Sequence, residues 1–272
     1  MTVVSNTSEA LNSPYTNALE HMLAETRAHA LESSVKEIDR LAIAHDASHY
    51  LLVPAGIVRP DSAEAVADIF RAASAFNLPL TFRSGGTSLS GQASSDGLMV
   101  DTRRNFKKIE VLDGGKRVRV QPGATVMAVN NMLAPYGYKL GPDPASWSAC
   151  TIGGVVANNS SGMSSGTEFN TYNTLESMVF VLPSGTVIDT SAPDADDRLR
   201  TLEPEIHEGL LRLHKRVVEN SESVARIRQQ YSMKNTMGYG VNSLLDYSTP
   251  VDILQHLLIG SEGTLGFVAS AT

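Results

Sequence analysis

The stretch Arg83-Ser84-Gly85-Gly86-Thr87-Ser88-Leu89-Ser90-Gly91-Gln92 decides how this sequence is interpreted. It directly follows residues 79–82, whose composition predicts a short strand. Adjacent glycines permit positive φ, so successive N–H groups can converge on an anion, and the absent Cβ atoms let phosphate oxygens approach the backbone. The stretch has neither the Gly-Lys-Ser/Thr of a Walker loop nor the GxGxxG turn that opens a helix. We therefore predict a phosphate-binding loop to which Arg83 contributes charge.

Two further glycine-rich regions follow this loop. Residues 140–146 and 151–162 combine glycines, small apolar residues and carboxamides, which describes a backbone lying against a flat ligand with polar edges. The same residues also fit a helix that Thr151 caps and that packs tightly through Gly153 and Gly154. Residues 259–268 predict a turn that leads into a strand. The residues alone leave both interpretations of the second region open.

The three regions together resemble the FAD-binding domain of the vanillyl-alcohol oxidase and p-cresol methylhydroxylase superfamily, in its D-lactate, glycolate and D-2-hydroxyglutarate dehydrogenase branch. The resemblance covers about residues 46–272. The motifs that carry it are Arg83–Thr87, Thr151–Gly154, Lys234-Asn235 with Gly238-Tyr239, and Gly260–Gly266. Residues 142–144 and 158–163 are also similar to the N-terminal part of long bacterial proteins that fuse this domain to an iron–sulfur region.

The resemblance implies FAD as the cofactor. The first loop would hold the pyrophosphate, residues 142–162 would line the isoalloxazine ring and ribityl chain, and residues 263–268 would contact the flavin and adenosine end. Covalent members often place a flavin-linking His where this chain has Thr87, so we expect non-covalent FAD. The expected FAD-binding residues are Arg83, Ser84, Gly85, Gly86, Thr87, Ser88, Gly91, Gln92, Pro142, Asp143, Ser146, Thr151, Ile152, Gly153, Gly154, Asn158, Ser161, Gly162, Gly263, Thr264, Gly266 and Val268.

The implied activity is oxidation of a small 2-hydroxy acid by hydride transfer to flavin N5. The family's substrate-binding and metal-binding residues belong to a cap domain, which we expect beyond residue 272 together with any iron–sulfur region. We therefore assign no catalytic residue and no metal ligand within this chain, and the electron acceptor stays unassigned. Two alternatives show the same motifs: a non-catalytic flavin-binding subunit of a complex, and an NADPH-fed flavin reductase of the cell-wall sugar-nucleotide type.

The expected fold is α+β, a two-subdomain FAD-binding fold of the p-cresol methylhydroxylase type. An N-terminal helical segment (1–45) would precede a small three-stranded parallel α/β unit (46–105). A larger, mainly antiparallel sheet with helices (106–272) would follow. We expect two short helices within 18–41, a Ser62-capped helix, hairpins at 109–120 and 178–188, a helix over 125–136 and a solvated loop over 190–204. The last strand, near 266–272, would leave an open edge.

Composition excludes several classes of protein. The net charge of −7 over 272 residues argues against nucleic-acid binding. No apolar run reaches the length of a membrane span, and residues 1–13 lack the layout of a signal peptide. The single cysteine, Cys150, cannot form an internal disulfide, so we expect a cytoplasmic protein. His45 and His49 have a zinc-like spacing but no third ligand nearby, which disfavours a metal site.

Overall fold

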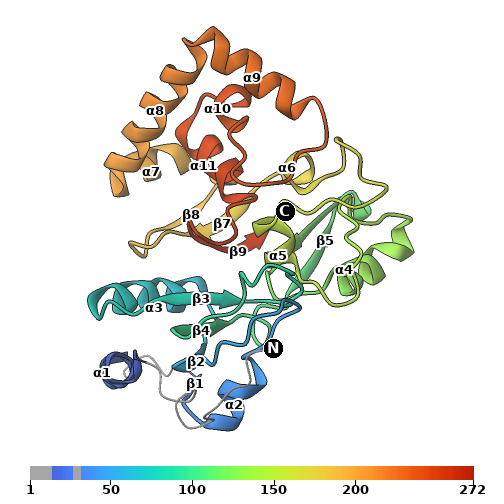
Figure 1. Ribbon diagram of the computed structural model, residues 1–272. Coiled ribbons are helices and arrows are strands. Elements are labelled where there is room, and N and C mark those ends of the chain that lie inside the picture. Colours follow the sequence, from blue (N-terminus) through green and yellow to red (C-terminus); the bar gives the residue numbers. More distant parts are fainter. Residues whose placement is uncertain (1–13, 27–31) are drawn as a thin grey trace.

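Two separate sheets organise residues 14–26 and 32–272, the part of the chain that the computed structural model describes (Figure 1). The strands are β1 (Glu32–Ser34), β2 (Gly56–Arg59), β3 (Leu80–Arg83), β4 (Leu98–Asp101), β5 (Ile109–Leu112), β6 (Arg117–Val120), β7 (Met178–Val181), β8 (Val187–Asp189) and β9 (Phe267–Ala271). The helices are α1 (Thr16–Thr26), α2 (Glu37–Ala42), α3 (Ala63–Ala75), α4 (Val126–Leu133), α5 (Ile152–Ala157), α6 (Thr171–Thr174), α7 (Ala195–Leu202), α8 (Pro204–Val218), α9 (Ser221–Tyr231), α10 (Ser243–Asp246) and α11 (Pro250–Leu258).

The first sheet has the order β1-β2-β4-β3, and its β2, β4 and β3 strands are parallel as predicted. The antiparallel edge strand β1 is a correction, because these residues lie within a stretch expected to be helical. Pairing with β2 outweighs local propensity there, and Glu32 also accepts hydrogen bonds from Arg59 and Arg104. The two short helices expected on either side are α1 and α2. Residues 1–13, on which the signal-peptide argument rests, and residues 27–31 lie outside the described part of the chain.

Helix α3 joins the two halves of the molecule. It begins where predicted, with the Ser62 hydroxyl accepting a hydrogen bond from the Ala65 N–H (3.2 Å). Ile69 on one face packs into the core of the first sheet, while Phe70 packs with Phe267 of β9 in a separate cluster. Figure 1 shows α3 lying between the two sheets. Truncating a buried side chain such as Ile69 to alanine should lower the free energy of unfolding by about 2–5 kcal/mol. This packing holds α3 on the first sheet and so fixes the position of the loop after β3.

The second sheet has the order β5-β6-β9-β7-β8 and is antiparallel throughout. Both predicted hairpins form, as β5–β6 and β7–β8. The expected open edge of the last strand is wrong, because β9 lies between β6 and β7 and bonds to both. With both sheets present, the structure confirms the predicted α+β class.

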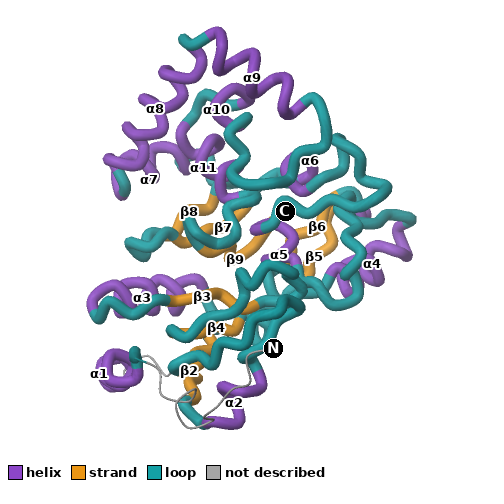
Figure 2. Tube along the Cα trace, viewed as in Figure 1, coloured by secondary structure: helices purple, strands orange, loops and turns teal. Residues whose placement is uncertain are grey.

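One of the helices beyond the second sheet corrects the loop expected over residues 190–204. Residues 195–202, expected to lie in a solvated loop, form α7, which packs against α8 and α11 (Figure 2). Acidic residues in its first turn and Arg200 in its last complement the helix dipole, and Leu199 is fully buried. The Asp, Ala and Pro residues that suggested a loop are therefore compatible with a short amphipathic helix. No helix among residues 14–26 and 32–272 is long and apolar enough to cross a bilayer.

Candidate functional site

A cavity of about 680 Å³ brings the three glycine-rich regions together. They come from the loop after β3, the start of α5 and the turn before β9, which are far apart in sequence. The predicted residues that line this cavity are Ser84, Gly85, Gly86, Thr87, Ser88, Gln92, Ser146, Thr151, Gly153, Gly154, Asn158, Gly263, Thr264, Gly266 and Val268. Within the described residues, the predicted residues outside the lining are Arg83, Gly91, Pro142, Asp143, Ile152, Ser161 and Gly162.

The first loop and the start of α5 are held together by hydroxyl groups. The Ser84 and Thr151 hydroxyls hydrogen bond to each other, and the Gly85 N–H donates to Thr151 Oγ1 (3.2 Å). A Cβ on Gly85 would lie 2.8 Å from the carbonyl oxygen of Ala149, so only glycine permits this contact. Thr151 therefore joins the two segments, and its side chain does not cap α5.

The start of α5 confirms part of the helix interpretation of the second region. A short helix forms, and its first N–H groups donate within the protein, Ile152 to the Ala124 carbonyl and Gly153 to the Pro122 carbonyl (both 2.9 Å). Those N–H groups are therefore engaged by protein carbonyls. A Cβ on Gly153 would lie 2.7 Å from Pro122, whereas a Cβ on Gly154 would meet nothing within 4 Å. Protein packing therefore requires a glycine at position 153 but not at position 154, where bare backbone faces the cavity.

The third region, the turn before β9, also lines the cavity. The Glu262 N–H donates to the Ala157 carbonyl (2.8 Å), and Asn158 donates to the Glu262 carboxylate (2.6 Å), which joins this turn to the end of α5. Gly263 has a φ of +77°, and a Cβ there would also meet nothing within 4 Å. Gly154 and Gly263 are thus two cavity-lining glycines whose missing side chains leave open space.

Arg83 lies behind the first loop. Its side chain is buried, with Nη1 donating to the Ala93 carbonyl (2.9 Å) and Nη2 donating to the His45 carbonyl. The sequence predicted that this guanidinium contacts the ligand, whereas in the structure it donates hydrogen bonds to two backbone carbonyls. Gly91 also lies away from the lining, because it packs beneath the ring of Tyr50.

Asp143 and Gly162 form a brace beside the cavity. The Asp143 N–H donates to the Ser161 carbonyl (2.9 Å), and a Cβ on Gly162 would overlap the Asp143 carboxylate. Hydrogen bonds from Ser164, and then from Ser165 (3.1 Å), lower the pKa of Asp143 despite its desolvation. Pro142, Asp143, Ser161 and Gly162 therefore shape the segments that carry lining residues such as Ser146 and Asn158.

Sequence reasoning missed lining residues that lie in strands, in a helix and in the loops next to them. Their signal is weak, because a side chain facing a cavity and one facing the core follow the same alternation along a strand. Cys150 lies in the lining and is buried, and burial raises the pKa of its thiol. Missed lining residues include Thr81, Phe82, Thr102, Pro122, Leu258, Ser261 and Glu262. Among the described residues of the lining, Glu262 is the only acidic one, and no Lys, Arg or His is present.

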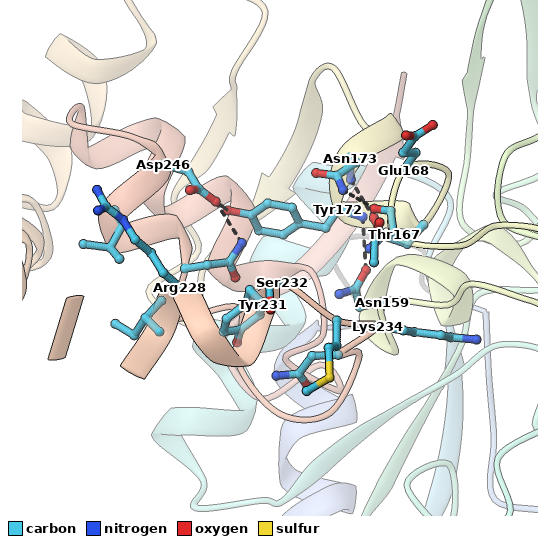
Figure 3. A pocket seen from close by; sticks show the side chains of 16 residues that line it. Asn159, Thr167, Glu168, Tyr172, Asn173, Arg228, Tyr231, Ser232, Lys234 and Asp246 are labelled. Atoms are coloured by element: carbon cyan, nitrogen blue, oxygen red, sulfur yellow. Dashed lines mark hydrogen bonds between the residues drawn. The ribbon is translucent and has the colours of Figure 1, made fainter. Parts of the chain in front are cut away.

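A second cavity, of about 650 Å³, lies among α6, α9 and α10 (Figure 3). Tyr172 points toward Asp246 and donates to its carboxylate (2.9 Å), as does the amide of Asn242 (2.8 Å). Burial and the Asp246 charge raise the pKa of Tyr172. Asn158 and Ser160 line the first cavity while Asn159 lines the second, so one segment separates the two.

Residues of the fourth sequence motif lie at this second cavity. Lys234 and Asn235 line it, and the Lys234 ammonium donates to the Gly162 carbonyl (3.1 Å). Tyr239 instead contacts the first cavity's wall, with its hydroxyl 2.7 Å from that of Thr264. Among the described residues, no three His, Cys, Asp or Glu side chains are grouped as a metal site would require.

A family model described as an FAD binding domain matches residues 54–191, about half of the chain and most of the first cavity's lining. The chain belongs to this family of FAD-binding domains.

Similar proteins agree on the FAD-binding fold. The chain is 32% identical over 244 residues to D-2-hydroxyglutarate dehydrogenase of Haemophilus influenzae, a match covering 86% of this chain and 24% of that protein. It is 35% identical over 118 residues to glycolate oxidase subunit GlcD of Escherichia coli, covering 43% of this chain and 24% of that protein. A solved structure of alkyldihydroxyacetonephosphate synthase superposes with a TM-score of 0.61 at 19% identity, covering 93% of this chain and 42% of that one. The chain thus spans about a quarter of the length of these two curated relatives.

FAD fits the first cavity on physical grounds. Its volume is within the range of about 300–1,000 Å³ usual for ligand and cofactor sites. Bare backbone at Gly154 and Gly263 leaves room for a rigid group, and the hydroxyls of the first loop offer donors to phosphate. The family resemblance, the p-cresol methylhydroxylase-type fold and the FAD cofactor expected from the sequence are confirmed.

Proposed function

We propose that this chain is the FAD-binding portion of a flavin-dependent oxidoreductase that oxidises a small 2-hydroxy acid and binds FAD non-covalently. The observation that carries the proposal is the cavity itself, which three sequence-distant regions line with backbone and hydroxyl groups. The relatives named after D-2-hydroxyglutarate and glycolate support the substrate class. The lone buried cysteine supports a cytoplasmic enzyme.

Within this proposal the chain binds and orients the cofactor. FAD supplies the hydride acceptor. The Ser84–Gln92 loop is placed to bind the pyrophosphate, and Gly154 and Gly263 leave space for the flavin or its ribityl chain. Their bare backbone admits a close, water-excluding contact, which orients the reacting group.

The substrate's carboxylate and its hydroxyl proton need partners that the cavity lining does not supply. Glu262 carries the only carboxylate among the described lining residues, and Asn158 donates a hydrogen bond to one of its oxygens. We therefore propose that the general base and the carboxylate-binding residues belong to a longer protein of the relatives' size.

Anaerobic reduction of the bound flavin tests the reaction. The flavin absorption band should bleach when D-lactate, glycolate or D-2-hydroxyglutarate is added to a protein of the relatives' length, and stay oxidised in residues 1–272 alone. Bleaching of both at similar rates would place the catalytic residues within this chain. Acid precipitation should release all the flavin, and colour retained on the precipitate would refute non-covalent binding.

A non-catalytic flavin-binding subunit is the second candidate, favoured by a lining that has no basic residue and one carboxylate. It predicts bound FAD that no 2-hydroxy acid reduces at any chain length. NADPH is added in a separate arm, because reduction by NADPH would indicate a flavin reductase instead.

A further inference from the structure

A group of buried polar atoms lies behind the phosphate-binding loop. It contains the Asp46 carboxylate, the Arg83 guanidinium and the Ser94 hydroxyl, and within the described residues the buried Arg83 Nε has no hydrogen-bond partner. Burial lowers the pKa of Arg83, and the negative charges of Asp46 and Asp101 oppose this shift. An arginine nevertheless stays protonated in proteins, so the loop rests on a permanent buried cation.

The hydrogen bonds of Arg83 join chain segments on two sides of this loop. One nitrogen donates to Ala93, just after the loop, and another donates to His45, which belongs to a different segment. The His45 segment makes a second contact, because the Ala47 N–H donates to the Gly86 carbonyl (2.9 Å). We call His45–Ala47 together with Arg83 the latch.

Gly86 lies between the latch and the cavity. It lines the cavity, yet a Cβ built on it would lie 2.6 Å from the Arg83 guanidinium, at a φ of +65°. The sequence suggested that Gly86 leaves room for phosphate oxygens. The geometry shows instead that a side chain there would collide with Arg83, so the guanidinium fills the space directly behind the loop.

We infer that Arg83 is a positioning residue, which fixes the Ser84–Gln92 loop in its anion-binding shape from behind and makes no contact with phosphate. The inference rests on the proposed position of the pyrophosphate on this loop. A planar guanidinium can serve two separate carbonyls at fixed angles, whereas a lysine ammonium is a point charge that holds neither direction. Arg83→Lys therefore keeps the charge and loses the geometry.

Hydrogen exchange of the loop amides in FAD-free protein tests the inference directly. In Arg83→Lys, exchange of the amides in residues 85–92 should quicken by roughly tenfold, and the dissociation constant for FAD should rise by a similar factor. Arg104→Met is the matched control, because it removes an exposed cation that pairs with Glu32 outside the cavity lining. That control should change neither quantity.

The outcomes separate the possible roles. A loss of FAD affinity with unchanged exchange in FAD-free Arg83→Lys would mean that Arg83 contacts the ligand, and no change in either would deny it a role. If the wild-type protein bound no FAD, the proposed function would fail, while exchange in FAD-free protein would still report on the latch.

A second variant covers the case in which Arg83→Lys does not fold. Ala47→Pro removes the N–H that bonds to Gly86 and leaves Arg83 in place. It should give the same loosening of the loop amides, and protected amides in this folded variant would overturn the latch.

Discussion

The two cavities have nearly the same volume, about 680 and 650 Å³, and are built from different materials. In the part of the chain that the structure describes, six glycines and many hydroxyl groups line the first, and no basic side chain does. Side-chain amides, tyrosines and charged residues line the second, where no described glycine is found. In the second cavity several of these groups bond to one another, as Tyr172 and Asn242 do with Asp246. The difference teaches that volume does not distinguish the two cavities, whereas the chemistry of their linings does.

Filling the first cavity should give the largest effect. Gly154→Leu would place a side chain in space that no protein atom occupies, so FAD affinity should fall by at least about a hundredfold, or ~2.7 kcal/mol. The FAD-free protein should keep its stability or gain up to about 1 kcal/mol from better helix propensity. Flavin fluorescence titration and urea unfolding measure the two quantities.

Gly209→Leu is the control for that substitution. Gly209 lies in α8 with its nearest potential contact at 3.7 Å, so the change is also open and helical but lies outside the first cavity. Its FAD affinity should equal that of the wild type. A similar loss in both variants would remove the special status of Gly154.

The second cavity should respond in stability and not in FAD binding. Asp246→Ala leaves the Tyr172 hydroxyl and the Asn242 amide without their acceptor, which should lower the free energy of unfolding by about 1–2 kcal/mol. Asp197→Ala, which removes an exposed pair with Arg200 and one acidic charge from the first turn of α7, should cost less than ~1 kcal/mol. A tenfold weaker FAD complex in Asp246→Ala would show that the two cavities are coupled.

Low pH should lower the free energy of unfolding through the brace that Asp143 and Gly162 form beside the first cavity. The folded pKa of Asp143 lies below its ordinary value of 3.8, so its contribution is complete above pH 3.8 and is lost as the pH falls through the folded value. We expect the wild type to lose up to ~1 kcal/mol more than Asp143→Asn over that acid range. Chemical unfolding at a series of pH values checks this, and parallel curves for the two proteins would contradict it.

Ionic strength should have the smallest effect, and that effect is on FAD binding. Since no cationic side chain from residues 14–26 and 32–272 lines the first cavity and Arg83 is buried, the dissociation constant for FAD should change by less than about twofold between low and high ionic strength. FAD titrations across that range measure it. A steep weakening with salt would indicate an exposed cation at the pyrophosphate.

The sequence predicted elements whose signals are local. Ser62 caps α3, the Asp113–Gly115 turn closes the β5–β6 hairpin, and the glycine-rich loop lies on the cavity. The sequence did not predict β1 or α7, because β1 is stabilised by pairing with β2 and α7 by packing against α8 and α11. The hydrogen bonds of Arg83 could not be predicted for a related reason: an arginine beside a phosphate loop suggests an ion pair, and only the fold brings the carbonyls of His45 and Ala93 to the guanidinium.

The central position of β9 bears on how the molecule folds. Strands β5 and β6 are adjacent in sequence, as are β7 and β8, so each hairpin can form early through local contacts. The sheet that unites them waits for residues 267–271, and Val120 must meet Ala271 across about 150 residues. Until that strand inserts, the two hairpins are separate units with exposed edges, a state open to aggregation. Insertion of β9 also brings Phe267 onto α3. Both halves of the molecule should therefore become protected together, late in folding.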